Sequence, residues 1–457
     1  MAASALLPEG LAAAIEEASG ARVVTVRPRG GGGASRDGAE LDLAWPSGRT
    51  ASAYLNYDVH KAGAGDDAAF VREAAVLRAL SGPLASAGVR VAPFFASVLE
   101  QRALLCGLVS GEDRFGGIGD AGRRSALAKD YMAQLAALHR IDIAATPVEG
   151  MGPVTPAETF VRERIAALRA ANSGRAWDPL IHLSLNWLEA NIPADMPAPV
   201  IVHGDAGPGN FLFDETRVTA LLDWELVHYG DPMADLAMLC LRMLFQGFVP
   251  LPEAFSAYEA AGGHRVDPVR VRYWRLLFQT GFARRSRYDD PDAPPPPNLG
   301  MNLVYSTIHR RVLSEALAEA AGIALSPVAF PAAPSGARAR SFAIALDDIR
   351  DAIVPRLSDQ QAAAKAKGMA RLIKWWQAIE RFEPGFLAAE KREIEAALGS
   401  DFLDHAAAWS AFRAAVADER IATGPAIRLC NAHEAREAAL MADAMGGLAD
   451  TKFAPLE

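Results

Sequence analysis

The sequence contains few cysteines. Only three are present among 457 residues, and Cys106, Cys240 and Cys430 lie far apart with no Cys-x-x-Cys spacing. This distribution excludes a disulfide framework and a cysteine-based zinc site, because both need clustered cysteines. We therefore look for chemistry carried by other side chains.

Excess positive charge and long apolar runs are also lacking. The formal net charge of −9 argues against nucleic acid or an anionic membrane surface as the main partner. No apolar stretch reaches the ~20 residues of a membrane-spanning helix. The first twenty residues lack a basic segment and carry Glu9, Glu16 and Glu17, unlike a signal peptide. We expect a cytoplasmic protein with no nucleic-acid and no membrane partner.

Apolar residues are plentiful, at 51% hydrophobic against 22% charged, which is typical of a globular protein with a large core. The length exceeds that of one ordinary domain. We expect a β-rich lobe over residues 1–110, a helical lobe over 111–328 and a helical region over 341–457. A stretch rich in Pro, Ala, Gly and Ser at 329–340 marks the last boundary.

The N-terminal region shows period-two alternation bounded by turn residues, which predicts strands. The expected order is a helix at 6–18, strands at 21–27, 39–45 and 50–57, a helix at 68–80, and strands at 94–99 and 103–109. Residues 110–112 then connect this region to the helical lobe.

Apolar residues at helical spacing predict an otherwise helical chain, apart from the stretch around 201–225. The expected helices of the middle region are 122–141, 160–171, 178–190, 252–261, 268–285 and 302–321; those of the last region are 342–357, 359–380, 384–398, 406–417 and 431–445. The last region has no catalytic motif. It could form a homodimer interface, cover an acceptor pocket or recruit a partner.

The stretch with the clearest chemistry is IVHGDAGPGNFLFDETRVTALLDWE, residues 201–225. Asp205 and Asn210 lie on a Gly/Pro loop, and Asp223 ends the second of two short strands. Carboxylate and amide oxygens are the ligands of hard cations such as Mg²⁺. The Asp205–Asn210 spacing equals that between the catalytic Asp and the metal-binding Asn of protein kinases. The stretch therefore predicts a phosphoryl-transfer site.

Each of these residues also has a structural alternative. Asp205 could cap a turn, Asn210 could occupy a left-handed turn and Asp223 could end a strand, but the combined spacing favours function. We expect His203 to orient the loop by hydrogen bonds and Glu225 to contact the metal through water or to contact substrate. Asp235 is expected to support the loop as a hydrogen-bond acceptor.

The motifs HGDAGPGN (203–210), DWE (223–225) and GDPMADLA (230–237) resemble those of the aminoglycoside phosphotransferase and choline kinase-like family. The resemblance implies an α+β, protein-kinase-like fold with a small antiparallel β lobe and a larger helical lobe. It implies Mg²⁺ and ATP or GTP as donor, a small-molecule hydroxyl acceptor, Asp205 as base, and metal ligation by Asn210 and Asp223. It covers about residues 20–325, and the C-terminal helices lie outside it.

The nucleotide half of the resemblance is incomplete. A turn with Gly31, Gly32, Gly33 and Ser35 lies where the family has a phosphate-binding turn, and the alternative is a flexible hairpin tip. Glu73 offers the acid of the following helix, and the alternative is a solvated helix carboxylate. The third strand, TASAYLNY, has Asn56 where the family has a Lys or Arg for the α- and β-phosphates. Either Lys61 supplies the cation, or Mg²⁺ and backbone suffice, or catalysis is impaired. The last option describes a catalytically impaired nucleotide- or metabolite-binding protein.

The acceptor is the least specified part. Members of the family are associated with aminoglycosides, macrolides, choline-like alcohols, homoserine and hydroxyacyl-coenzyme A thioesters, and a fold does not choose among them. The C-terminal helices show no dense acidic run for a polycationic antibiotic. We therefore favour a catabolic hydroxy compound.

Overall fold

The computed structural model describes residues 6–29, 36–58, 67–283, 294–332 and 336–456. The chain divides into two compact units: unit 1 comprises residues 1–160, 195–271 and 454–457, and unit 2 comprises 161–194 and 272–453. Each unit is described by itself.

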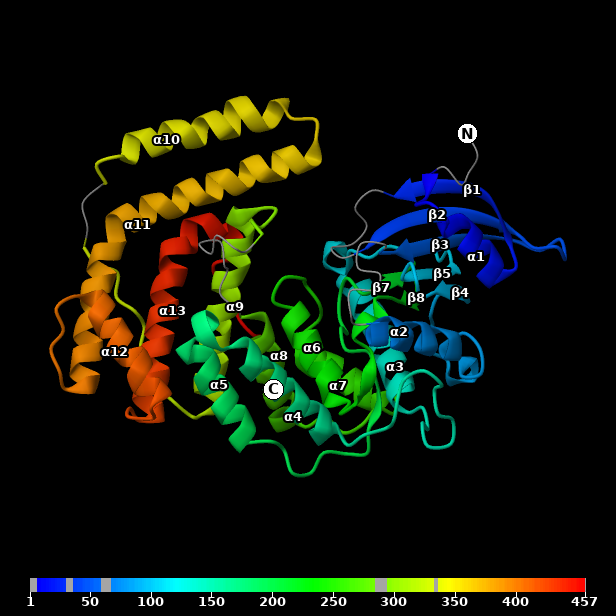
Figure 1. The fold of residues 1–457 in the computed structure, drawn as a ribbon, viewed down its shortest axis with the longest axis horizontal. Coiled ribbons are helices and arrows are strands. Elements are labelled where there is room, and N and C mark those ends of the chain that lie inside the picture. Colours follow the sequence, from blue (N-terminus) through cyan, green and yellow to red (C-terminus); the bar gives the residue numbers. More distant parts are fainter. Residues whose placement is uncertain (1–5, 30–35, 59–66, 284–293, 333–335, 457) are drawn as a thin grey trace. The chain divides into compact units, whose positions relative to one another are not determined.

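Unit 1 begins with an antiparallel sheet. Its strands are β1 (Arg22–Arg29), β2 (Asp37–Ala44), β3 (Thr50–Tyr57), β4 (Phe94–Val98) and β5 (Ala103–Gly107), in the order β1-β2-β3-β5-β4 (Figure 1). Alternate residues such as Leu41 and Leu55 are fully buried with Leu11 and Ile15 of α1 (Leu11–Ser19). Burial of one face by α1 explains the period-two pattern of the sequence.

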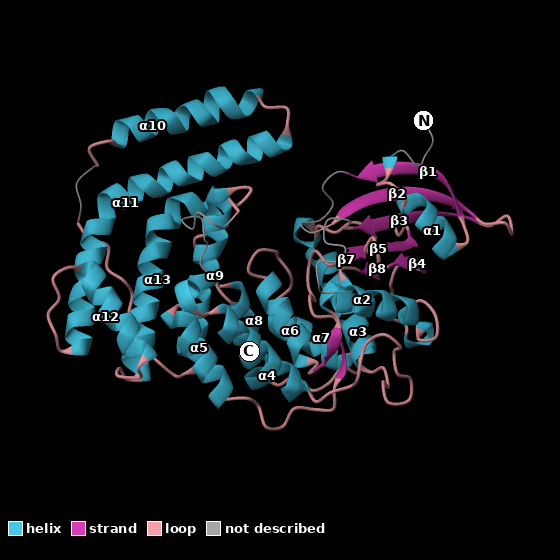
Figure 2. Ribbon diagram, viewed as in Figure 1, coloured by secondary structure: helices cyan, strands magenta, loops and turns pink. Residues whose placement is uncertain are grey.

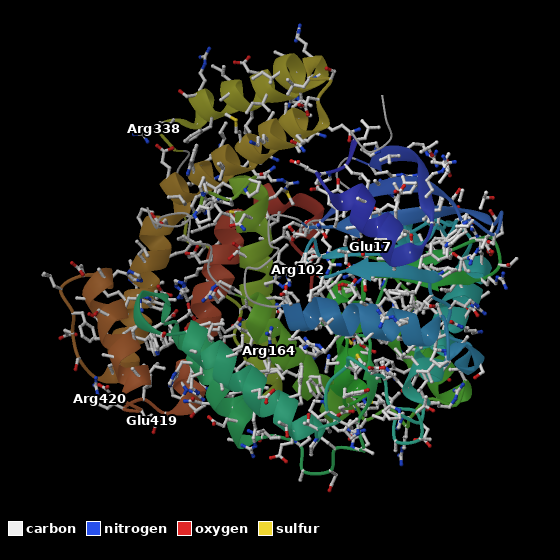
Figure 3. The ribbon with its side chains drawn as sticks, turned by 45° about the vertical axis from the view of Figure 1, so that its right-hand side comes forward. Glu17, Arg102, Arg164, Arg338, Glu419 and Arg420 are labelled. Atoms are coloured by element: carbon white, nitrogen blue, oxygen red, sulfur yellow. The ribbon has the colours of Figure 1, made fainter. Side chains whose placement is uncertain are left out.

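Helix α2 (Asp67–Leu80) follows β3 and precedes β4, which is the kinase-like order of elements. Arg102, labelled in Figure 3, lies in the turn between β4 and β5 with a φ of 44°, and its Nε is 3.5 Å from Oδ1 of Asp67 at the start of α2. The face of the sheet away from α1 carries Asn56, which pairs with Gly38 of β2 and Leu104 of β5.

The rest of unit 1 holds two short hairpin-like sheets between helices. Strand β6 (Val200–Val202) pairs with β9 (His228–Gly230), and β7 (Phe211–Phe213) pairs with β8 (Val218–Leu221). The helices are α3 (Ala121–His139), α6 (Met233–Arg242) and α7 (Leu251–Ala260). The rings of Phe211 and Tyr131 stack with centroids 4.4 Å apart, which fixes β7 on α3.

Unit 2 is helical in all its described secondary structure (Figure 2). Its helices are α4 (Ala157–Ala171, which begins in unit 1), α5 (Pro179–Ala190), α8 (Pro268–Phe282, mostly in unit 2), α9 (Leu299–Ala320), α10 (Ala339–Asp347), α11 (Gln360–Leu398), α12 (His405–Ala417) and α13 (Thr423–Met445). Helix α9 packs against α11 and α13, and α11 packs against α12. A Cβ on Gly300 of α9 would lie 2.1 Å from the carbonyl oxygen of Gly368 of α11, so the two backbones touch.

The predicted α+β class is confirmed, with a small antiparallel β lobe, a helical lobe and a C-terminal helical region. Three helix predictions are wrong in their bounds. The predicted helix 6–18 begins only at Leu11. The predicted helices 359–380 and 384–398 are one helix, α11, which contains Pro384, and the predicted helix 431–445 begins at Thr423. Proline removes one helical hydrogen bond but keeps a helical φ, and buried residues on both sides, Gly368 and Phe386, hold the helix together.

The described helices include none with both the length and the apolar character needed to cross a lipid bilayer.

Candidate active site

The loop after β6 is held in place by a buried carboxylate of α6. Asp235 is fully buried and accepts hydrogen bonds from the backbone N–H groups of His203 and Gly204, both at 2.8 Å. Its Oδ2 also lies 3.0 Å from Nε2 of His139, whose Nδ1 is 2.7 Å from the hydroxyl of Tyr258. The predicted supporting residue Asp235 therefore fastens the start of the loop to three helices.

Two pKa shifts fit this supporting role. Burial would raise the pKa of Asp235, but the hydrogen bond and charge of His139 hold it below its ordinary value. Burial lowers the pKa of His203. His203 Nε2 lies 2.8 Å from the carbonyl oxygen of Leu222, and its Nδ1 accepts from the backbone N–H of Asp205 at 3.3 Å. With both ring nitrogens engaged in hydrogen bonds, His203 orients the loop.

Asp205 and Asn210 meet on this loop. Asn210 Nδ2 donates to Asp205 Oδ2 at 2.6 Å and to the Asp205 carbonyl oxygen at 2.8 Å. Arg242 of α6 donates from Nη1 to the same Oδ2 at 2.8 Å, from Nη2 to Asn210 Oδ1 at 3.0 Å and from Nε to the Pro208 carbonyl at 2.9 Å. The guanidinium thus joins both predicted functional side chains.

Arg242 was not predicted from the sequence. The available signal was its position seven residues after Asp235 on the same helix, which is about two turns and therefore the same face. Two residues of one helix face hold the two ends of the loop. Arg242 is thus the first residue of the candidate site that the sequence motifs do not indicate.

Asp223 has an unusual backbone and an unusual charge environment. Its φ of 67° is left-handed, a conformation that costs free energy in residues other than glycine and is concentrated at functional sites. Burial, followed by the negative charges of Glu225, Asp205 and Glu73, raises the pKa of Asp223 to about 6. Carboxylates that repel one another in a partly buried place favour the binding of a cation.

The side-chain oxygens at this site could supply part of the coordination shell of Mg²⁺. Within the described part of the chain, no three His, Cys, Asp or Glu side chains are grouped so that they could hold a metal ion. Magnesium in phosphoryl-transfer sites is bound by one or two carboxylates together with substrate phosphates and water. Asp223 supplies such a carboxylate, and its left-handed backbone and the neighbouring carboxylates fit a cation. The Asn210 amide oxygen accepts from Arg242 Nη2 at 3.0 Å and would have to exchange that bond for the metal.

On the nucleotide side, Glu73 of α2 is buried and paired with Arg36. Its Oε2 lies 2.7 Å from Arg36 Nη2, and the side chains are 5% and 14% exposed. The contact is a short ion pair between two largely buried side chains. Burial raises the pKa of Glu73 although the Arg36 charge opposes the shift. Arg36 Nη2 is also 3.8 Å from Glu225 Oε2.

The other predicted nucleotide-binding residues, Gly31, Gly32, Gly33, Ser35 and Lys61, lie outside the described residues. The site that the structure brings together thus consists of the loop residues Asp205 and Asn210, the strand-end Asp223, and the pair Arg36 and Glu73. Arg36 is the second residue that the sequence argument missed.

An antiparallel lobe with a buried helix glutamate, followed by a loop with Asp205 and Asn210 and by Asp223, is the set of parts found in kinase-like phosphotransferases. Residues 59–274 match the model of the phosphotransferase enzyme family. The resemblance drawn from the motifs is therefore confirmed for this segment.

The curated relatives are much longer than the matched segment. The chain is 34% identical over 120 residues to acyl-CoA dehydrogenase family member 11 of Gallus gallus, which is 25% of this chain and 15% of that protein. It is 29% identical over 140 residues to acyl-CoA dehydrogenase family member 10 of Mus musculus, which is 29% of this chain and 12% of that protein. The chain thus spans less than a fifth of the length of these relatives.

Solved structures of phosphotransferases are also similar. A macrolide 2'-phosphotransferase, MphH of Brachybacterium faecium, is 21% identical with a TM-score of 0.40, over 60% of this chain and 93% of that one. An aminoglycoside phosphotransferase, APH(4)-Ia, in complex with ADP and hygromycin B is 16% identical with a TM-score of 0.47, over 68% and 99%.

Proposed function

We propose that the protein transfers the γ-phosphoryl group of ATP or GTP to a hydroxyl of a small-molecule acceptor in a Mg²⁺-dependent reaction. Asp205 orients the acceptor hydroxyl and takes its proton. Asn210 and Asp223 hold the metal, and Glu225 contacts the metal through water or contacts the substrate. His203 and Asp235 keep the loop in shape.

The observation that carries the proposal is the asymmetric engagement of the Asp205 carboxylate. Both of its side-chain contacts with described residues, from Asn210 and Arg242, are made to Oδ2. The other oxygen, Oδ1, is thereby oriented and remains for the proton of an acceptor hydroxyl. The side chain is 19% exposed, so a small molecule can reach it. A base needs this combination of fixed orientation and access.

Magnesium, when bound, would neutralise charge that develops on the phosphoryl group. The chain's own contribution is to position the donor and acceptor, since phosphoryl transfer depends mainly on positioning and electrostatics. Burial, together with the negative charges of Glu225, Asp205 and Glu73, raises the pKa of Asp223, and this environment supports a cation-requiring site.

For the acceptor we favour a catabolic hydroxy compound over an antibiotic. The similarity to proteins named as acyl-CoA dehydrogenase family members supports this choice, and hydroxyacyl-coenzyme A thioesters are the first class to test. The acceptor can be identified by measuring ATP consumption with a panel of candidate compounds. The panel contains hydroxyacyl-coenzyme A thioesters, choline-like alcohols, homoserine, macrolides and aminoglycosides.

With the selected acceptor, Asp205→Ala is expected to lower kcat by about 10²- to 10⁴-fold, the usual contribution of a general base. The dissociation constant for ADP should stay within a few-fold, because Asp205 acts on the acceptor. Steady-state kinetics and titration calorimetry measure the two quantities.

Asp214→Ala is the matched control, because Asp214 lies on the turn between β7 and β8 and its contacts are with Thr216 and Arg217. It should keep normal kcat. A fully active Asp205→Ala protein contradicts the assignment. A wild-type protein that binds ADP and phosphorylates no member of the panel favours the catalytically impaired alternative.

A further inference from the structure

Strand β3 has no cation. It reads TASAYLNY, and Asn56 lies on the face away from α1, opposite Gly38 of β2 and Leu104 of β5. In kinase-like sites a basic residue on this strand binds the donor's phosphates and pairs with the helix glutamate. Glu73 is present and buried on α2. The pairing acid is therefore retained, whereas its usual partner is missing.

Arg36 directly precedes β2 and reaches that acid. Residues two apart in an extended segment point to the same side, so Arg36 shares a face with Gly38 and, through the strand register, with Asn56. The distance of 2.7 Å between Arg36 Nη2 and Glu73 Oε2 shows that a cation–glutamate pair exists in this protein. Its cation comes from the residue that precedes the neighbouring strand, β2.

We propose that Arg36 binds the phosphates of the nucleotide donor, in place of the basic residue absent from β3. The proposal rests on the proposed function. Arginine suits the task because its planar guanidinium has five N–H donors and binds phosphate in a bidentate manner. Among the described residues, the contacts of Arg36 with Glu73 and Glu225 both use Nη2. Nη1 and Nε remain for phosphate oxygens.

A purely structural role explains the pair less well. A buried ion pair is often no more stabilising than apolar residues of similar size, because both charges must be desolvated. Arg36 also lies beside the Glu225 carboxylate, so it faces the side where the metal ligands and the donor would be.

The test compares nucleotides with and without phosphates on the full chain. Titration calorimetry of Arg36→Ala with ADP and Mg²⁺ should show a loss of affinity of about 10- to 100-fold, the effect of hydrogen bonds to a charged group. Affinity for adenosine should be unchanged. Arg29→Ala is the matched control, because Arg29 is an exposed arginine of the same hairpin that pairs with Glu40; it should bind ADP normally.

A second variant moves the charge back to β3. Because Asn56 shares the face of Arg36, the double variant Arg36→Ala/Asn56→Lys should regain at least half of the lost affinity on a logarithmic scale. Failure to regain the affinity would mean that a cation on this face of the sheet does not contact the phosphates. It would overturn the proposal that Arg36 replaces the basic residue of β3.

Two further results would overturn the proposal: wild-type ADP affinity in Arg36→Ala, or an equal loss of ADP and adenosine affinity, which would indicate a structural role. Neither depends on catalysis. If the wild-type protein binds ADP but transfers no phosphoryl group, the proposed function is contradicted. The comparison of ADP affinity between wild type and Arg36→Ala still tests the role of Arg36 in that case.

Discussion

Gly204 shows how tightly the loop before Asp205 is built. Its φ is +87°, and a Cβ at this position would lie 2.2 Å from the carbonyl oxygen of Leu226. Its backbone N–H is bound by Asp235. Any side chain would have to push away the segment that follows Asp223, so both halves of the site depend on this glycine.

The substitution Gly204→Ala is expected to lower kcat at least 100-fold and to destabilise the protein by about 2–4 kcal/mol. About 1 kcal/mol comes from the left-handed backbone, and the rest comes from the clash with backbone that must shift. Urea unfolding and the transfer assay measure the two effects.

Gly48→Ala separates the two causes. Gly48 also has a positive φ, +83°, but a Cβ there would meet nothing within 4 Å. It should lose only about 1 kcal/mol and keep its activity. Equal losses in both variants would show that the clash with Leu226 is relieved at no cost.

The functional residues of the loop could be predicted from the sequence, whereas Arg36 and Arg242 could not. Asp205, Asn210 and Asp223 lie within nineteen residues of one another and follow a known spacing. Arg242 reaches the site from 37 residues beyond Asp205, and Arg36 reaches it from the residue before strand β2. Such pairings follow from the tertiary structure, and an arginine in a sequence is by default a solvated surface charge.

At the scale of elements, three helices of unit 2 meet at Arg310 of α9, which is 3% exposed. Its Nε and Nη2 donate to the two carboxylate oxygens of Glu434 of α13 at 3.0 and 2.6 Å. Nη2 also donates to Asp178 Oδ2 at 3.0 Å, and Asp178 Oδ1 accepts from the first backbone N–H groups of α5. One guanidinium therefore fixes the positions of α5, α9 and α13.

We expect Arg310→Met to destabilise unit 2 by about 3–5 kcal/mol, because it removes the buried cation that neutralises the carboxylates of Glu434 and Asp178. The measurement is the urea midpoint followed by far-UV circular dichroism. Arg350→Ala is the control, since Arg350 pairs with Asp347 and Asp351 but is 68% exposed, and exposed pairs contribute little. A midpoint of Arg310→Met equal to that of Arg350→Ala would refute the argument.

Elements were predicted best where one face is buried. Strand β3 begins and ends where the alternation of TASAYLNY predicts, because α1 covers one face of the sheet. Helix α11 was divided wrongly at Pro384 because the sequence shows the lost hydrogen bond but not the packing that compensates for it. The short strand β9 was missed because its three residues carry no periodicity.

At the scale of the whole molecule, the C-terminal helices are part of a unit that includes middle segments of the chain. Unit 2 contains residues 161–194 as well as 272–453. Helix α9 buries Ile308, Val312 and Leu317 and packs against α13. Nδ2 of Asn431 on α13 donates to Ser314 Oγ of α9 at 2.9 Å, and both side chains are buried. Residues on both sides of the 329–340 stretch thus share one core.

This shared core predicts the result of cutting the chain. A specific protease site inserted between the exposed residues Ser326 and Pro327 can be cleaved after folding. The two fragments are expected to elute together in gel filtration and to separate only in denaturant, because separation would expose the apolar face of α9 and leave Arg310 without Glu434. An uncleaved sample of the same variant is the control.

Fragments that separate in native buffer, with the first one monodisperse and active, would show that the C-terminal helices are an independent domain. Co-elution would mean that α9 and the C-terminal helices form one core that survives cleavage of the chain.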